Sequence, residues 1–184
     1  MKFHHAELPG IFIIENNLFT DDRGVFVKVY HEQVFAAHGA PCHFQECFYS
    51  ISHQNVIRGM HFQTPPFHNT RLVWVLAGAV RDVVVDIRQC SPTYSRCLVI
   101  ELSADNGLSL LIPPGFAHGF AVLRPPAIVG YLQTSVYSPV HDLGVRYDSF
   151  GLDWGIPAPI LSARDLSFPR LAEFDSPFIY KGEA

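Results

Sequence analysis

The clearest candidates for chemistry are side chains that strand alternation would gather on one face. Alternate residues of a β-strand point to the same side. In one run those residues are Val129, Tyr131, Gln133, Ser135 and Tyr137. Two tyrosines and two polar groups on one face predict a wet cavity, with a solvent-facing outer surface as the alternative. The same alternation places Phe116, His118, Phe120 and Val122 on a common face.

Two histidines stand in strings that are similar to the paired motifs of cupins. The string G-x5-P-x-G-x2-H, which ends at His118, has the spacing of the second cupin motif. In metal cupins the first motif carries two histidines and a glutamate. Here Gln63 stands in place of the histidine after His61, and no glutamate follows at a suitable distance. A metal site needs three or four ligands, and His68 is only a distant third. We therefore expect no metal and no cofactor, and His118 is either a hydrogen-bonded barrel histidine or a functional one.

Three arginines are candidates for phosphate binding. Arg23, Arg58 and Arg71 each stand beside a predicted strand or turn and lie far apart in the sequence. The guanidinium group suits bidentate recognition of phosphate. Taken singly, each of them is also compatible with an ordinary surface position.

The elements that must position these side chains are short strands rich in Val, Ile, Phe and Tyr, separated by turn residues. Turns are predicted at Ala77-Gly78, Asp105-Asn106-Gly107, Pro113-Pro114-Gly115 and Pro125-Pro126, and a helix at 31–40. Strands are predicted at 10–14, 25–30, 44–52, 56–62, 71–76, 79–87, 96–102, 108–112, 116–123 and 128–137. Many short strands with regular turns indicate an all-β antiparallel barrel or jelly roll.

Composition and length predict a single globular domain. The chain has 184 residues, of which 48% are hydrophobic and 16% charged, which excludes a disordered chain. No repeat or shift in composition marks a boundary, so we expect one domain over residues 1–184. The proline-rich segment 151–184 is expected to wrap the barrel, with short helical turns near residues 162–166.

Charge and local composition argue against several partners. A net charge of −4 disfavours nucleic-acid binding through bulk electrostatics. No apolar run approaches the roughly 20 residues of a membrane span, and the first ten residues lack the apolar stretch of a signal peptide. The four cysteines, Cys42, Cys47, Cys90 and Cys97, lack C-x-x-C spacing and do not form a disulfide scaffold. We therefore expect a cytoplasmic protein.

Taken together, the strings resemble the dTDP-4-dehydrorhamnose 3,5-epimerase family of nucleotide-sugar epimerases. Each string alone is weak, but their order and spacing are specific, and they extend from about residue 19 to about residue 169. The matching segments are 22–26 (DRGVF), 56–63 (VIRGMHFQ), 82–88 (DVVVDIR), 91–94 (SPTY), 112–120 (IPPGFAHGF), Tyr131 with 137–139 (YSP), and Leu161, Ser162 and Asp165.

The resemblance implies a fold, an assembly and a set of roles. It implies a homodimeric cupin jelly roll without metal, acting on a nucleoside-diphospho-4-keto-deoxy sugar. His61 would be the general base, Asp165 would orient it, and Tyr131 would be the acid. Arg58 and Arg23 would hold phosphate, Arg23 from the neighbouring subunit. The other substrate-binding positions that it implies are Phe26, Lys28, Glu46, Phe48, Arg71, His118 and Tyr137.

These residue types suit the implied reaction. A proton next to a ketone is acidified because the carbanion delocalises into the C4 oxygen as an enolate. Histidine is a suitable base near neutral pH, and a carboxylate partner fixes its tautomer. A cation beside the ketone would stabilise the enolate.

The sequence departs from the family at several substrate-binding positions. Arg71 stands where the family usually has Lys, and Lys28 where it often has Glu. Glu46 and Phe48 fall on a string that commonly reads Q-[DE]-N. These positions lie around the base and sugar pocket in the family, so the nucleotide is predicted to be other than thymidine, with GDP or CDP as alternatives. In particular, Glu46 would accept hydrogen bonds from a donor-rich base edge, with a solvent-facing position or a pair with Lys28 as the alternative.

Several functions remain open from the sequence alone. The expected activity is epimerisation at C3, C5 or both, in deoxysugar and polysaccharide biosynthesis. A 3,4-ketoisomerase and a non-catalytic cupin that binds sugar nucleotides are alternatives. The retained His61, Tyr131 and Asp165 favour the epimerase, and the missing second histidine disfavours a metal-dependent oxygenase. The nucleotide, the sugar and the number of inverted centres are not determined by these strings.

Overall fold

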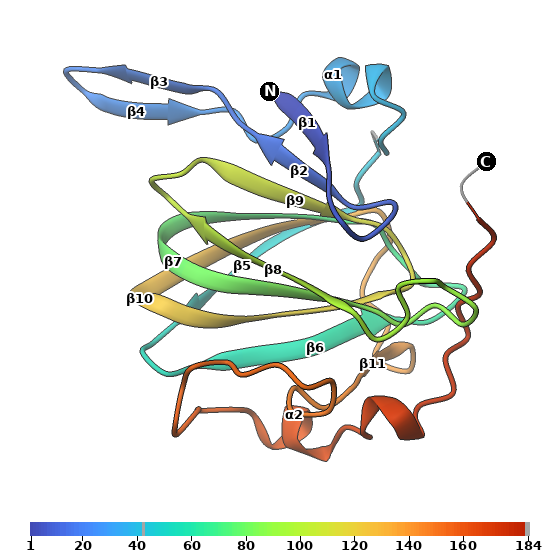
Figure 1. Cartoon of the computed structure of the whole chain (residues 1–184). Coiled ribbons are helices and arrows are strands. Elements are labelled where there is room, and N and C mark those ends of the chain that lie inside the picture. The colour runs from blue at the N-terminus through green and yellow to red at the C-terminus, as the bar shows by residue number, and fades with distance from the viewer. Residues whose placement is uncertain (42, 183–184) are drawn as a thin grey trace.

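Strands make up almost all of the regular structure (Figure 1). The computed structural model describes residues 1–41 and 43–182, so the expectation for Cys42 lies outside the described residues. The helices are α1 (Glu32–Ala37), α2 (Ala163–Ser167) and a 3-10 turn at Leu171–Glu173. The strands are β1 (Lys2–His5), β2 (Phe12–Glu15), β3 (Leu18–Asp21), β4 (Gly24–Val27), β5 (Glu46–Ser52), β6 (Ile57–Gln63), β7 (Arg71–Asp86), β8 (Cys97–Ser103), β9 (Leu108–Ile112), β10 (Phe116–Gln133) and β11 (Asp142–Gly144). The expected class, mostly β with a few short helices, is confirmed.

Two long antiparallel strands form the spine of a nine-stranded sheet over the described residues. β7 and β10 pair along their whole length, from Phe116 opposite Asp86 to Gln133 opposite Arg71. In one half, β9 pairs with the start of β7 and β5 with the end of β10, and β2 and β1 continue beyond β9. In the other half, β8 pairs with the end of β7, β6 with the start of β10, and β11 with β6.

The two halves meet at a bend that the sequence had marked as turns. Ala77-Gly78 and Pro125-Pro126 lie inside β7 and β10 and do not end them, so the shorter strands predicted on either side are wrong. The pairing shifts register on both sides of Arg124, and such bulges bend a strand without ending it. Gly78 has φ +74°, and a Cβ there would lie 2.3 Å from the carbonyl oxygen of Arg124. Only glycine fits this crossing.

Side chains from both halves of the sheet pack into one interior core. It includes Val73 and Val84 from opposite ends of β7, and Phe116, Phe120 and Val129 from β10. Phe116, Phe120 and Val122 lie in this core and His118 lines the cavity, whereas the intervening Ala117 and Ala121 pack in the cluster under the tail, which confirms the predicted common face. Phe120 and Tyr131 of this core also line the cavity described below.

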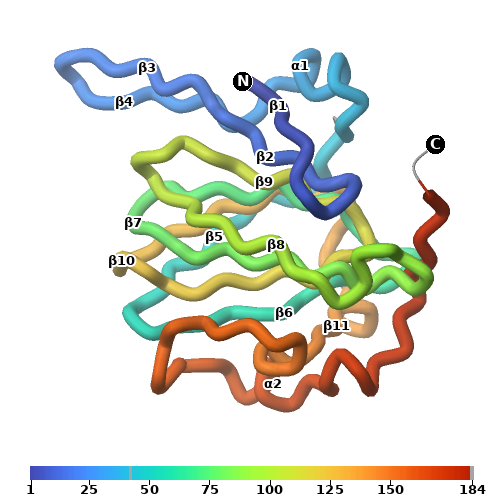
Figure 2. Tube along the Cα trace, in the orientation of Figure 1, coloured from blue at the N-terminus to red at the C-terminus, as the bar shows by residue number. Residues whose placement is uncertain are grey.

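The outer faces of the sheet are covered by the two terminal segments. Ile57, Met60 and Phe62 of β6 point outward and pack against Trp154, Leu171 and Phe178 of the tail. The tail also bridges to the sheet at Val56–Ile160 and Gln89–Ile179, and it runs beneath β6 in the trace of Figure 2. On the first half, Phe35 of α1 packs over Leu72 and Leu111.

The β3–β4 hairpin projects away from the sheet (Figures 1 and 2). Its two strands pair only with each other. Phe19 and Phe26 expose 57% and 61% of their surface. Among the helices of the described residues, none has the length and apolar character needed to cross a membrane.

Candidate active site

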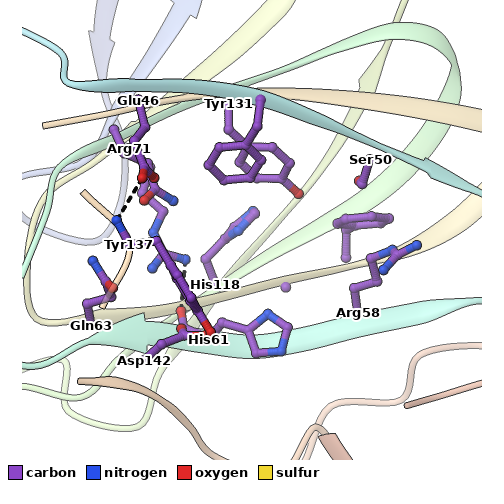
Figure 3. Close-up of a pocket in the computed structure, with 14 residues that line it drawn as sticks. Glu46, Ser50, Arg58, His61, Gln63, Arg71, His118, Tyr131, Tyr137 and Asp142 are labelled. Carbon is purple, nitrogen blue, oxygen red and sulfur yellow. Dashed lines mark hydrogen bonds between the residues drawn. The ribbon is translucent and has the colours of Figure 1, made fainter. Parts of the chain in front are cut away.

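A cavity of about 400 Å³ opens between the two halves of the sheet (Figure 3). Its walls come from β5, β6, β7 and β10, with one further wall from the segment after β10. The predicted wet face therefore exists for Tyr131, Gln133 and Tyr137, although β10 ends at Gln133 and Val129 belongs to the apolar core. The predicted site residues that line the cavity are Glu46, Phe48, Arg58, His61, Arg71, His118, Tyr131 and Tyr137.

His61 is held by a buried carboxylate. Its Nε2 lies 2.8 Å from Oδ1 of Asp165, and the backbone N–H of Gly59 donates to Oδ2 of Asp165 at 3.1 Å. Asp165 is only 4% exposed. Burial alone would raise the pKa of Asp165, but the hydrogen bonds from His61 and Gly59 outweigh it and hold that pKa below its usual value. The carboxylate is therefore ionised at neutral pH and can orient the imidazole and stabilise its protonated form.

Local structure explains why these two residues meet. Strand alternation sends His61 and Gln63 of β6 into the cavity, while Met60 and Phe62 face the tail. Arg58, an odd number of residues before His61, also reaches the cavity because the pairing of β6 with β10 shifts register between them. Asp165 belongs to α2, which begins after Ser162, whose hydroxyl accepts the N–H of Asp165 as an N-cap. The tail thus brings Asp165 up to the strand from outside.

A second histidine–aspartate pair lies deeper in the interior. Nε2 of His118 lies 2.9 Å from Oδ2 of Asp82, and both residues are almost completely buried. Oδ1 of Asp82 has no hydrogen-bond partner. Sequence reasoning missed Asp82 as a site residue, although a charged residue within the apolar run of β7 was a usable signal. The two interpretations of His118, a hydrogen-bonded barrel histidine and a functional one, are therefore compatible. His118 is hydrogen-bonded to Asp82 and also lines the cavity.

Tyr131 and His61 stand on opposite walls of the cavity (Figure 3). The ring of Tyr131 stacks on Phe48, with centroids 4.9 Å apart and planes at 16°. Burial raises the pKa of Tyr131, and the negative charge of Asp82 raises it further, while Arg71 opposes both. Tyr131 therefore holds its proton at neutral pH, as a proton donor must.

Two arginines bring positive charge to the cavity. Arg71 is buried; its Nε donates to Asn69 and its Nη1 donates to the carbonyl oxygen of His61 at 3.0 Å. Among the described residues no carboxylate lies within 4.0 Å of its guanidinium, and burial lowers its pKa. Arg58 lies on the same wall as His61 (Figure 3) and donates to Ser52 and the carbonyl oxygen of Ile51.

The structure does not bring Arg23, Phe26 and Lys28 to this cavity within one chain. Arg23 lies at the tip of the projecting hairpin, where it pairs with Asp21. Phe26 and Lys28 line a separate hollow at the base of the hairpin, together with His31. Lys28 therefore shares no surface with Glu46 and Phe48 in one chain, and the three departures from the family do not form a common group there.

Other polar groups of the cavity escaped sequence reasoning. Asp142 lies on its wall and pairs with Arg164 of α2 at 2.7 Å. Gln63, considered only as a missing metal ligand, accepts the backbone N–H of Ser138 at 2.7 Å. Within residues 1–41 and 43–182, no three His, Cys, Asp or Glu side chains are grouped so as to hold a metal ion.

Known proteins share both the sequence pattern and this architecture. The model of the family described as dTDP-4-dehydrorhamnose 3,5-epimerase matches residues 5–173. The chain belongs to this family. The predicted family and an isomerase of the epimerase type are thereby confirmed.

Individual relatives of the epimerase match over nearly their whole length. The dTDP-4-dehydrorhamnose 3,5-epimerase of Shigella flexneri is 36% identical over 95% of this chain and 98% of its own. A Bacillus anthracis structure of an enzyme of the same name, with TDP and pyrophosphate bound, has a TM-score of 0.88 at 39% identity, covering 91% of this chain and 98% of its own. A Legionella pneumophila 3,5-epimerase in complex with dTDP-4-keto-L-rhamnose has a TM-score of 0.91 at 31% identity, covering 100% and 99%.

Proposed function

We propose that this epimerase inverts a carbon next to the ketone of a nucleoside-diphospho-4-keto-deoxy sugar bound in the cavity. The observation that carries the proposal is the His61–Asp165 pair on the wall opposite Tyr131, with the buried Arg71 cation lining the same cavity. A base and an acid on two sides of one cavity can remove a proton from one face of a carbon and return one to the other.

The reaction follows from these positions. His61 takes the proton from the carbon through the ring nitrogen that Asp165 does not engage, and the electron pair of the C–H bond moves into the ketone as an enolate. Arg71 and His118 stabilise the oxygen of the enolate. Tyr131 then gives its proton to the opposite face of the same carbon and becomes a tyrosinate, whose charge Arg71 and Arg58 offset. Proton exchange with solvent then returns His61 to its neutral form and Tyr131 to its phenol form.

We propose that the active form is a homodimer in which the hairpin completes the neighbouring site. The support is the projection of the hairpin and the exposure of Leu18, Phe19, Val25 and Phe26, an apolar surface that a lone chain would leave in water. In this arrangement Arg23 reaches the phosphates held by Arg58 of the partner. Phe26 and Lys28 lie beside the base.

The fold and the cellular setting are part of the same proposal. We assign the bent nine-stranded sheet to the cupin jelly rolls because β7 and β10 each serve both halves. The described cysteines, Cys47, Cys90 and Cys97, are free thiols, as is usual in a reducing cytoplasm.

We propose thymidine diphosphate as the nucleotide. TDP or a TDP sugar is bound in the Bacillus and Legionella relatives, and Glu46, predicted to accept hydrogen bonds from another base, is occupied by the chain itself. Competition of TDP with GDP and CDP tests this choice. A preference for GDP or CDP of tenfold, about 1.4 kcal/mol, would restore the sequence-based hypothesis.

The activity is tested by incubating the chain with a TDP-linked 4-keto-6-deoxyhexose in D₂O. We expect deuterium at C3, C5 or both, with inversion of the exchanged centre, seen by NMR. Migration of the ketone without inversion would instead identify an isomerase, and no change in a substrate that binds would identify a binding protein.

A further inference from the structure

The segment that carries Tyr137 is tied to the sheet by side chains and not by strand pairing. β10 ends at Gln133, and Tyr137 lies four residues later, at the mouth of the cavity. Its side chain crosses the front of the cavity in Figure 3, near Asp142 and His61. Because 56% of Tyr137 is exposed, packing contributes little to holding the ring in place.

Two successive backbone N–H groups provide the attachment. The N–H of Tyr137 donates to Oε1 of Glu46 at 2.8 Å, and the N–H of Ser138 donates to Oε1 of Gln63 at 2.7 Å. Glu46 begins β5 and Gln63 ends β6, so the segment is fastened to two different walls of the cavity. The dashed line in Figure 3 follows the contact from Glu46 to Tyr137.

The two attachments differ in redundancy. Within the segment, Nε2 of Gln63 also donates to the carbonyl oxygen of Val136 at 3.2 Å and to the hydroxyl of Ser135 at 3.4 Å. Gln63 therefore grips the segment at several points. Glu46 meets it through a single bond, at the N–H of Tyr137 itself.

We propose that Glu46 is a positioning residue, whose side-chain oxygen holds Tyr137 against the bound nucleotide sugar through the N–H of Tyr137. The identity of the ligand in this inference rests on the proposed function. The anchoring of Tyr137 rests only on the hydrogen bond from its N–H to Glu46. It assigns Glu46 a task within the chain, which replaces the prediction that Glu46 reads a base edge. Glutamine also offers an Oε1 acceptor, so the acceptor and not the charge is the essential property.

Kinetics of matched variants test the proposal. Glu46→Ala should raise KM about tenfold and change kcat by less than about twofold, since one net hydrogen bond is worth roughly that factor in affinity. Glu46→Gln should keep the KM of the wild type. Tyr137→Ala should raise KM at least as much, and adding Glu46→Ala to it should have little further effect.

A measurement independent of activity follows the same bond. The chain has 7 tyrosines, so ¹⁵N-tyrosine labelling gives a simple amide spectrum in which Tyr137→Phe identifies the signal of residue 137. That amide should exchange with solvent faster in Glu46→Ala, and at the wild-type rate in Glu46→Gln.

Three results would overturn the proposal. They are a Glu46→Gln variant that behaves like Glu46→Ala, fully additive effects of the Glu46 and Tyr137 changes, and unchanged exchange at residue 137 in Glu46→Ala. A wild-type chain that incorporates no deuterium would overturn the proposed function instead, and amide exchange alone would then decide whether Glu46 anchors Tyr137.

Discussion

Replacement of Asp165 by Asn probes the base directly, because it keeps the shape of the side chain and removes its charge. Asp165 accepts two hydrogen bonds, from His61 at 2.8 Å and from the Gly59 N–H at 3.1 Å. An amide can accept only one of them, since its NH₂ group must face the other donor. If the NH₂ faces His61, the imidazole is forced into the other tautomer, and the nitrogen that faces the substrate is no longer a base.

The size of the effect follows from the lost charge. A hydrogen bond to a charged partner contributes about 1.5–3 kcal/mol. At about 1.4 kcal/mol per factor of ten, kcat should fall on the order of 10- to 100-fold. KM should stay near that of the wild type, because Asp165 is not among the residues that line the cavity.

The assay is the initial rate of deuterium incorporation from D₂O, with nucleotide affinity measured on the same samples. Asp148→Asn is the matched control, because Asp148 pairs with Arg146 and lies away from the cavity. The reasoning is refuted if a folded Asp165→Asn protein exchanges at the rate of the control.

Three further expectations follow from the same geometry. Tyr131→Phe should lose inversion but keep some deuterium exchange with retained stereochemistry, because protonated His61 can exchange its proton for a solvent deuteron and return that deuteron to the same face; NMR of the product would show this, and normal inversion would contradict it. Mixing Arg23→Ala with His61→Asn protein should restore part of the activity, since one site of each heterodimer keeps both residues; a wild-type chain that sediments as a monomer would rule this out. The lowered pKa of Asp165 means that its ionised form stabilises the fold above the ordinary aspartate pKa of about 4 and ceases to do so as pH falls through the folded-state value. The gap in unfolding midpoint between wild type and Asp165→Asn should therefore shrink on acidification from about pH 6 to about pH 3, and a constant gap would oppose it.

Strand alternation was enough to predict the inward face of the cavity but not its full set of partners. It placed Tyr131 and Gln133 together because the pairing of β10 with β7 runs without a register shift from Val129 to Gln133. It also placed Tyr137 on this face, and Tyr137 does line the cavity, but for a different reason, because the segment after Gln133 leaves the strand and is positioned by side chains. The position of Tyr137 therefore depends on hydrogen bonds to Glu46 and Gln63, which the strand periodicity does not predict.

Long-range partners were accessible only through the resemblance to a family. Asp165 lies 104 residues from His61. Helical turns were predicted near residues 162–166, where α2 lies, but no local pattern places that helix beside β6. At Gly78 the local signal for a turn was correct, but the conclusion that a strand ends there was wrong. Its backbone does take the left-handed conformation of a turn, but the strands on both sides stay paired to β10 and the chain bends there without reversing.

The most direct test of the account is the exchange activity of His61→Asn. Asparagine fits the space of histidine and cannot act as a base near neutral pH, while Arg58 and Arg71 remain to bind the nucleotide sugar. We predict that this variant binds TDP with the affinity of the wild type and incorporates no deuterium into a 4-keto sugar nucleotide. Exchange at the wild-type rate would show that another group removes the proton and would contradict the central claim.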